Sequence, residues 1–197
     1  MSKFSIDIFL KNFLDALNSV DQDYYRIETT YDPHGVVRER VFCYELYHQL
    51  RISLTNDYPY KIHGELDKHG HREIQRQNQK IPDFLFHIPG THDENNVIVE
   101  VKGSLNRHLI ISDLVKIKSF MANVNYKFGV FLLFSYTLEN FLDEIKFSEI
   151  AINRTNRILF QENDLDEKIF IICTPRNRVY SIITFNDFKI RGLYENL

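Results

Sequence analysis

The chain has 197 residues and a mass of 23.5 kDa, with 44% hydrophobic and 26% charged residues. This length suits a single domain over residues 1–197, and the ordinary globular composition excludes extended disorder. The formal net charge of -3 excludes a protein that coats nucleic acid through bulk positive charge, so any contact with nucleic acid must come from a local patch.

The cysteines and the first residues of the chain bear on the cellular compartment. Cys43 and Cys173 lie in apolar surroundings without CxxC spacing, and two thiols are too few to staple a chain of this size, so we expect buried free thiols. Charged residues interrupt the apolar residues near the N-terminus, and no apolar run approaches the roughly 18 residues of a membrane span. We therefore expect a soluble, cytoplasmic protein.

Apolar residues at helical spacing predict two helices in the first quarter of the chain, over residues 5–17 and 36–50. The first belongs to an N-terminal helical extension, residues 1–30. Its apolar face would pack on the domain itself or against a second copy of the chain. A turn-prone segment, residues 31–35, separates the two helices, and a strand is expected over residues 60–67.

The second half of the chain predicts a sheet with further helices. Residues 128–134 form a continuous apolar run, typical of a strand buried on both faces. Ser112 or Asp113 would cap a helix that runs to about Asn123. The last predicted elements are a helix over residues 138–152 and strands over residues 168–173 and 179–185. This order of elements predicts an α/β fold with a mixed β-sheet flanked by helices.

Two predicted strands in the middle of the chain, residues 81–88 and 96–102, carry charged residues at their ends. The first opens with a Pro-Asp dipeptide that contains Asp83, and the second ends with Glu100 and Lys102. Side chains alternate faces along a strand, so Glu100 and Lys102 point to the same face, about 7 Å apart. The valines that alternate with them form a stripe on the other face, which suits a core.

The relative register of these strands decides whether the charged residues meet. The link between them contains a Pro-Gly turn signal and is otherwise polar. If Ile88 pairs with Asn95, an antiparallel ladder places Asp83 directly opposite Glu100, on the same face of the sheet. Two carboxylates and a lysine then converge at the end of the hairpin.

Two neighbouring carboxylates repel each other unless a positive charge lies between them. A hard divalent cation with oxygen ligands is the natural occupant, and we expect Mg²⁺, with Mn²⁺ as a substitute. Such an ion can activate a water molecule and stabilise negative charge on a phosphoryl oxygen. Lys102, at the edge of the site, could orient the attacking water or neutralise the phosphate.

The position of these residues on a predicted hairpin makes the metal-site interpretation specific, because the acid-x-Lys triplet alone is common. An acid-x-Lys triplet occurs four times, at Glu100-Val101-Lys102, Glu144-Ile145-Lys146, Asp166-Glu167-Lys168 and Asp187-Phe188-Lys189. Only the first lies on a predicted strand rich in β-branched residues, next to the single Pro-Asp dipeptide of the chain. The competing interpretation is a surface ion pair between Asp83 and Lys102.

Through the Pro-Asp dipeptide and the Glu-x-Lys triplet, the sequence resembles the PD-(D/E)xK superfamily of restriction endonuclease-like nucleases. The predicted catalytic core, residues 36–135, has the element order that the resemblance implies: helix, strand, motif hairpin, helix, strand. The resemblance implies a restriction endonuclease-like fold, with Asp83 and Glu100 as metal ligands and Lys102 as the catalytic lysine.

A third carboxylate is also implied by the resemblance. In that family a helix before the first core strand often supplies one more acidic residue, and Glu45 matches it by position, as a further metal ligand and catalytic residue. Glu65 is the rival, because it lies on the predicted strand that carries His63 and Asp67 on one face.

Basic residues gather in the polar segment after this strand, where they offer a local patch for nucleic acid or form a solvated loop. They are Lys61, Lys68, His69, His71, Arg72, Arg76 and Lys80. No Cys or paired His at zinc spacing accompanies His69 and His71, so loop histidines are the preferred interpretation over metal ligands. Lys116 and Lys118 follow the motif on the next helix, where solvated side chains are the preferred interpretation and a phosphate contact is the alternative.

These patterns predict a Mg²⁺-dependent nuclease that hydrolyses phosphodiester bonds, with DNA preferred over RNA as the substrate. A homodimer would pair two such sites to cut both strands. The alternative is a catalytically inert member of the same fold that binds nucleic acid or serves as an assembly subunit, for example of a defence complex. A different phosphohydrolase or a purely structural domain is a third interpretation.

Overall fold

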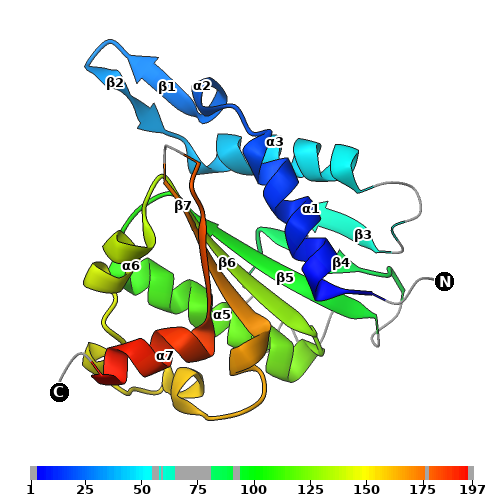
Figure 1. Cartoon of the computed structure of the whole chain (residues 1–197), viewed down its shortest axis with the longest axis vertical. Coiled ribbons are helices and arrows are strands. Elements are labelled where there is room, and N and C mark those ends of the chain that lie inside the picture. Colours follow the sequence, from blue (N-terminus) through cyan, green and yellow to red (C-terminus); the bar gives the residue numbers. More distant parts are fainter. Residues whose placement is uncertain are drawn as a thin grey trace. The chain divides into compact units, whose positions relative to one another are not determined.

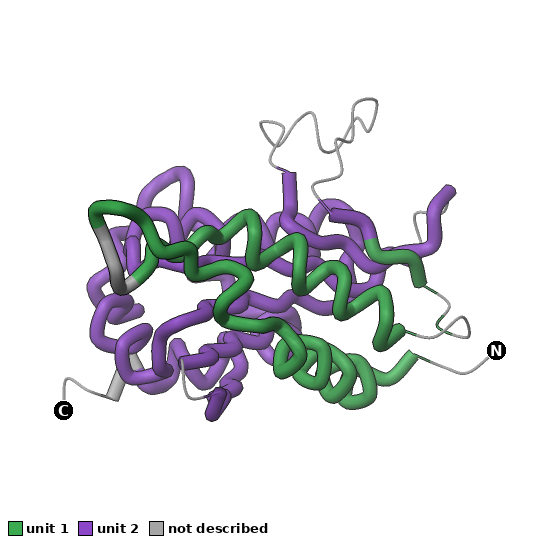
Figure 2. Tube along the Cα trace, turned by 90° about the horizontal axis from the view of Figure 1, so that it is seen from above, with its two compact units in different colours: residues 1–62 green, residues 63–197 purple. Residues whose placement is uncertain are grey.

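The computed structural model describes residues 4–54, 58, 60–64, 81–90, 94–175 and 178–194. The chain divides into two compact units, Met1–Ile62 and His63–Leu197, which Figure 2 shows in different colours. Within the described ranges, no helix is both long enough and apolar enough to cross a membrane.

The first unit contains helices and a short hairpin. Its elements are α1 (Ile6–Asn18), α2 (Gln22–Tyr25), β1 (Arg26–Thr29), β2 (Asp32–Val37) and α3 (Glu39–Ser53). The Ser5 hydroxyl accepts a hydrogen bond from the Ile8 N–H and caps α1, which confirms the first predicted helix. Helices α1 and α3 pack against each other through buried apolar residues such as Phe13 and Leu46.

The second predicted helix begins later than expected. Val36 and Val37 belong to β2 and pair with Ile27 and Arg26 of β1, so α3 starts only at Glu39. The segment predicted as a turn, residues 31–35, falls largely within β2. The reason is pairing with a partner strand, because two β-branched residues in succession favour a strand once a partner is available.

A mixed six-stranded sheet organises the rest of the chain, in the order β3-β4-β5-β6-β7-β8 (Figure 1). The strands are β3 (Lys61–Gly64), β4 (Phe84–His87), β5 (Asn95–Lys102), β6 (Phe128–Phe134), β7 (Ile169–Thr174) and β8 (Ser181–Thr184). The central pairs β5–β6 and β6–β7 are parallel, whereas β4–β5 and β7–β8 are antiparallel. The predicted α/β class with a mixed sheet and flanking helices is confirmed.

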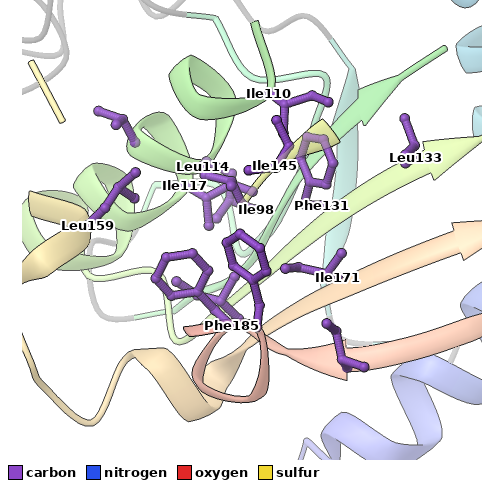
Figure 3. Packing of buried hydrophobic residues seen from close by; sticks show 14 of the residues in the cluster. Ile98, Ile110, Leu114, Ile117, Phe131, Leu133, Ile145, Leu159, Ile171 and Phe185 are labelled. Carbon is purple, nitrogen blue, oxygen red and sulfur yellow. The ribbon is translucent and has the colours of Figure 1, made fainter. Parts of the chain in front are cut away.

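Three helices of the second unit pack on one face of this sheet, namely α5 (Arg107–Val124), α6 (Leu138–Glu144) and α7 (Phe185–Tyr194). Their apolar residues form one cluster with alternate residues of the strands. In Figure 3, Ile98 of β5 lies beside Leu114 and Ile117 of α5. This packing fixes α5 against the strand that carries the motif.

Strand β6 confirms the expectation for the apolar run. It has a parallel neighbour on each side, and residues 129–134 are all buried. Gly129 lets α5 approach closely, because a Cβ atom at this position would collide with the Ile117 side chain and crowd Met121.

Several boundaries in this unit differ from the prediction. Helix α5 begins at Arg107, where the Asn106 side chain accepts a hydrogen bond from the Leu109 N–H at 3.1 Å, so neither Ser112 nor Asp113 is the cap. The predicted helix over residues 138–152 ends at Glu144 and gives way to a short 3₁₀ helix, η1 (Phe147–Glu149). Helix α7 was not predicted. Both cysteines are free and buried, as expected.

We predict that Gly129→Ala lowers the free energy of unfolding by about 1–3 kcal/mol, because the added methyl group forces α5 away from β6. Urea unfolding followed by circular dichroism measures this change. The exposed substitution Ala122→Ser on α5 is the control and should change stability by about 0.5 kcal/mol or less. Equal stability of Gly129→Ala and the parent chain would contradict the close contact.

Candidate functional site

The hairpin of β4 and β5 has the predicted register at its motif end. Phe84 pairs with Val99, and Leu85 pairs with Ile98. Continued by one residue, this ladder brings Asp83 opposite Glu100. Near the turn the ladder shifts by one residue, and the Ile88 N–H donates to the Glu94 carbonyl rather than pairing with Asn95. The irregularity is confined to the turn end, away from the charged residues.

Asp83 is fixed by the backbone of the neighbouring strand. Its Oδ2 atom accepts a hydrogen bond of 2.7 Å from the Val101 N–H. Burial raises the pKa of Asp83 to about 6, although the hydrogen bond from Val101 and the positive charge of Lys116 act in the opposite direction. The side chain is therefore held in place, and its negative charge is incompletely compensated.

Glu100 lies deeper, with only 1% of its surface exposed. Its Oε2 atom is 2.6 Å from the Lys116 ammonium nitrogen, whereas Oε1 has no hydrogen-bond partner among the described residues. Burial raises the pKa of Glu100 well above its usual range, while the Lys116 charge lowers it, and Asp83 and Asp113 raise it further. An unpartnered buried carboxylate oxygen is costly, which marks this atom as a place for a ligand.

Helix α5 supplies two charged residues that complete the cluster. Asp113 Oδ2 lies 3.1 Å from the Lys102 nitrogen, and Asp113 Oδ1 lies 3.4 Å from the Lys116 nitrogen. Burial lowers the pKa of Lys116, but attraction by Glu100 and Asp113 outweighs this effect and the pKa is raised. The chain of contacts Lys102, Asp113, Lys116, Glu100 alternates positive and negative charges, with Asp83 at its side.

The position of α5 explains why these two residues were missed. Asp113 was expected at the helix start, which is wrong because the helix begins at Arg107. Lys116 was expected in solvent, which is wrong because it faces β5 and pairs with Glu100. Asp113 and Lys116 then lie one turn apart on the side of α5 that faces β5. The available signal was their spacing, because an acid and a lysine three residues apart on a helix lie on the same side of it.

Lys118, the second lysine expected in solvent, is fully buried away from the site. Its ammonium nitrogen lies 2.6 Å from Asp166 Oδ1 and donates to the Gln161 carbonyl. The other oxygen of Asp166 binds Lys189 at 2.9 Å. The Asp166 triplet is therefore a structural ion cluster, and the hairpin triplet is the one of the four that lies on a strand.

Glu45, Glu65 and the basic residues are the other predicted site residues. Glu45 is on α3 in the first unit, partly buried, and its Oε1 accepts a hydrogen bond of 2.7 Å from Gln49. Its role as a third carboxylate stays a prediction. Glu65 lies outside the described residues, as do the basic residues of the proposed patch other than Lys61, which is exposed.

The cluster can be compared with what a magnesium ion requires. No group of three or more His, Cys, Asp or Glu side chains in the described part of the chain is arranged to hold a metal ion. Mg²⁺, however, needs only one or two carboxylates because it retains several water ligands. The unpartnered Oε1 of Glu100 and the raised pKa of Asp83 both fit a nearby cation. The residues present therefore fit a two-carboxylate site.

The fold and site define an α/β protein with a mixed six-stranded sheet and a partly buried cluster of three carboxylates and two lysines, which come from β5, α5 and the residue before β4. The chain matches no protein-family model, no curated protein and no solved structure.

The raised pKa of Asp83 predicts a pH-dependent stability in metal-free protein. The folded state binds this proton more tightly than the unfolded chain, so the contribution is complete below about pH 4 and is lost as the pH rises through about 6. Asp83→Asn should lack this loss, which we expect to be about 1–3 kcal/mol in the parent chain. Urea unfolding at four pH values between 4 and 7 compares the two proteins. Parallel pH profiles would show that Asp83 titrates normally.

Proposed function

We propose that the chain is a metal-dependent nuclease of the PD-(D/E)xK type, with a restriction endonuclease-like fold. The observation that carries the proposal is the buried Glu100 carboxylate, which has one unpartnered oxygen and lies within electrostatic reach of Asp83. The Lys102 side chain lies on the same face of β5 as that of Glu100, because the two residues are two positions apart on the strand. The register of the hairpin brings the three motif residues together.

The order of elements supports the same proposal. Along the chain, α3 is followed by β3, the hairpin β4–β5, α5 and β6. This is the order helix, strand, motif hairpin, helix, strand that the resemblance implies. The motif also lies where a strand end meets a helix that supplies further charged groups.

In this proposal Asp83 and Glu100 would hold Mg²⁺, or Mn²⁺ in its place. When bound, the ion supplies a positive charge that stabilises the phosphoryl oxygen and makes a water molecule a stronger nucleophile. Asp83 is oriented for this role by the Val101 N–H, and Glu100 by the strand on which it is buried. Glu45 remains the proposed third carboxylate.

Lys102 is proposed to meet the phosphate. Its ammonium group is oriented by Asp113 at 3.1 Å, and 14% of its side chain is exposed, so it is held in place yet accessible. A positive charge fixed in advance stabilises the charge that develops on the phosphate without further reorganisation. DNA is the proposed substrate, and its binding would depend on a local basic surface because the whole chain is acidic.

We expect Lys102→Ala and Asp83→Ala each to reduce Mg²⁺-dependent cleavage by about 100-fold or more, because each removes a group that acts on the phosphate or the metal. Gel assays with single-stranded, duplex and branched DNA, and with RNA, measure the rate. Lys146→Ala changes the lysine of a triplet outside the sheet and should leave the rate unchanged. Cleavage that persists in Lys102→Ala or Asp83→Ala would rule out this site.

A second candidate function is an inert module of the same fold that binds nucleic acid or assembles with a partner. The short ion pair between Lys116 and Glu100 favours it, because the pair neutralises a proposed metal ligand from within. This candidate predicts that the folded chain shifts DNA in a gel without cleaving any of the four substrates. Metal-dependent cleavage that requires Asp83 would exclude it.

A further inference from the structure

Lys116 places its ammonium group beside Glu100, the most deeply buried carboxylate of the cluster. Its nitrogen lies 2.6 Å from Glu100 Oε2 and 3.4 Å from Asp113 Oδ1, and its charge also acts on Asp83. Only 13% of its side chain is exposed. This ammonium group thus acts on all three carboxylates, with Lys102 as the second cation of the cluster, on the face of the sheet where the proposed metal would bind.

This arrangement sets Lys116 against a divalent ion. A metal at Asp83 and Glu100 would lie next to the ammonium, and two cations at such distances repel each other strongly in a buried site. The metal would also compete directly for the Glu100 carboxylate. Each cation therefore binds Glu100 more weakly when the other is present.

The lysine has other acceptors within reach. The Ile81 carbonyl oxygen already lies 3.4 Å from its nitrogen, and Asp113 lies one helical turn away on α5. The side chain can leave Glu100 by rotating about its own bonds, without moving the backbone of α5. Its ammonium then keeps at least one hydrogen-bond partner, so release does not strand a buried charge.

We propose that Lys116 is an internal counter-ion that competes with the divalent metal for Glu100: a metal on the unpartnered Oε1 weakens the hold of Oε2 on the ammonium, and the ammonium weakens the binding of the metal. The inference rests on the proposed function, because it concerns the same metal site. It makes the lysine a regulator of metal affinity: the site is stable without metal and is loaded only at a sufficient metal concentration.

The first test is calorimetric titration of the full chain with Mn²⁺ alone at pH 8, where protons compete less for Glu100. We expect Lys116→Met to bind Mn²⁺ at least about tenfold more tightly than the parent chain, because the competing charge is gone. Lys118→Met is the matched control, since it removes another buried, paired lysine of α5 that contacts Asp166 instead. It should leave the affinity unchanged.

The second test needs no variant and so does not depend on how well Lys116→Met folds. An amine-acylating reagent, followed by mass spectrometry of peptides, measures the reactivity of each lysine with and without Mg²⁺. We expect the reactivity of Lys116 to rise at least about threefold with Mg²⁺, because the contact with Glu100 that holds the amine, with only 13% of the side chain exposed, is weakened. Lys118 should stay unreactive in both conditions, since Asp166 holds it.

The outcomes separate the two proposals. Mn²⁺ binding by the parent chain with equal or weaker binding by Lys116→Met, or a Lys116 reactivity that does not rise in a parent chain that binds metal, would overturn the counter-ion role and leave the nuclease proposal standing. Binding by Lys116→Met alone would support the counter-ion role and favour the inert module. Failure of both folded proteins to bind Mn²⁺ would overturn the metal site and the inference together.

Discussion

The site depends on the burial of one carboxylate. Glu100 lies on a central strand of the sheet with 1% of its surface exposed, where an ionised group is costly unless it is paired. Lys116 supplies the partner from α5, Asp113 binds Lys116 in turn, and Lys102 binds Asp113. Lys116, Asp113 and Lys102 are therefore linked, directly or through a neighbour, to the compensation of Glu100, whereas Asp83 is held by the Val101 N–H.

The fold meets this need with two simple devices. The antiparallel register of β4 and β5 carries Asp83 to the end of the hairpin, where the Val101 N–H binds it. Apolar packing fixes α5 on β5, with Ile98 beside Leu114 and Ile117 (Figure 3). It thereby fixes where along β5 the charged groups of Asp113 and Lys116 lie. Because the core is close-packed, the position of α5 relative to β5 is hard to change, which suits a site whose groups must be held in place.

Local patterns predicted the parts of the structure that depend on neighbours in sequence. The apolar run of β6 and the helix α1 were predicted because strand and helix periodicity are local signals. The hairpin register was predicted at its motif end because the alternation of side chains fixes it. The start of α5 was missed because its cap, Asn106, lies outside the periodic segment, and the pairing of Lys116 with Glu100 because the partner is on another element. The β1–β2 hairpin was missed although its strands are neighbours in sequence, because Val36 and Val37 were assigned to the helix that follows. The sequence alone does not show which strand residue will pair with a charged residue of a helix, because the pairing depends on how the helix packs on the sheet.

Asp83 and Glu100 are proposed to hold one divalent cation together. Anomalous diffraction from crystals of the chain soaked with Mn²⁺ tests it most directly, because the signal locates the ion without reference to activity. The account predicts one Mn²⁺ ion with oxygens of both carboxylates at about 2.0–2.5 Å. Crystals that show no Mn²⁺ at these residues, or Mn²⁺ bound only elsewhere, while Glu100 remains paired with Lys116, would contradict it.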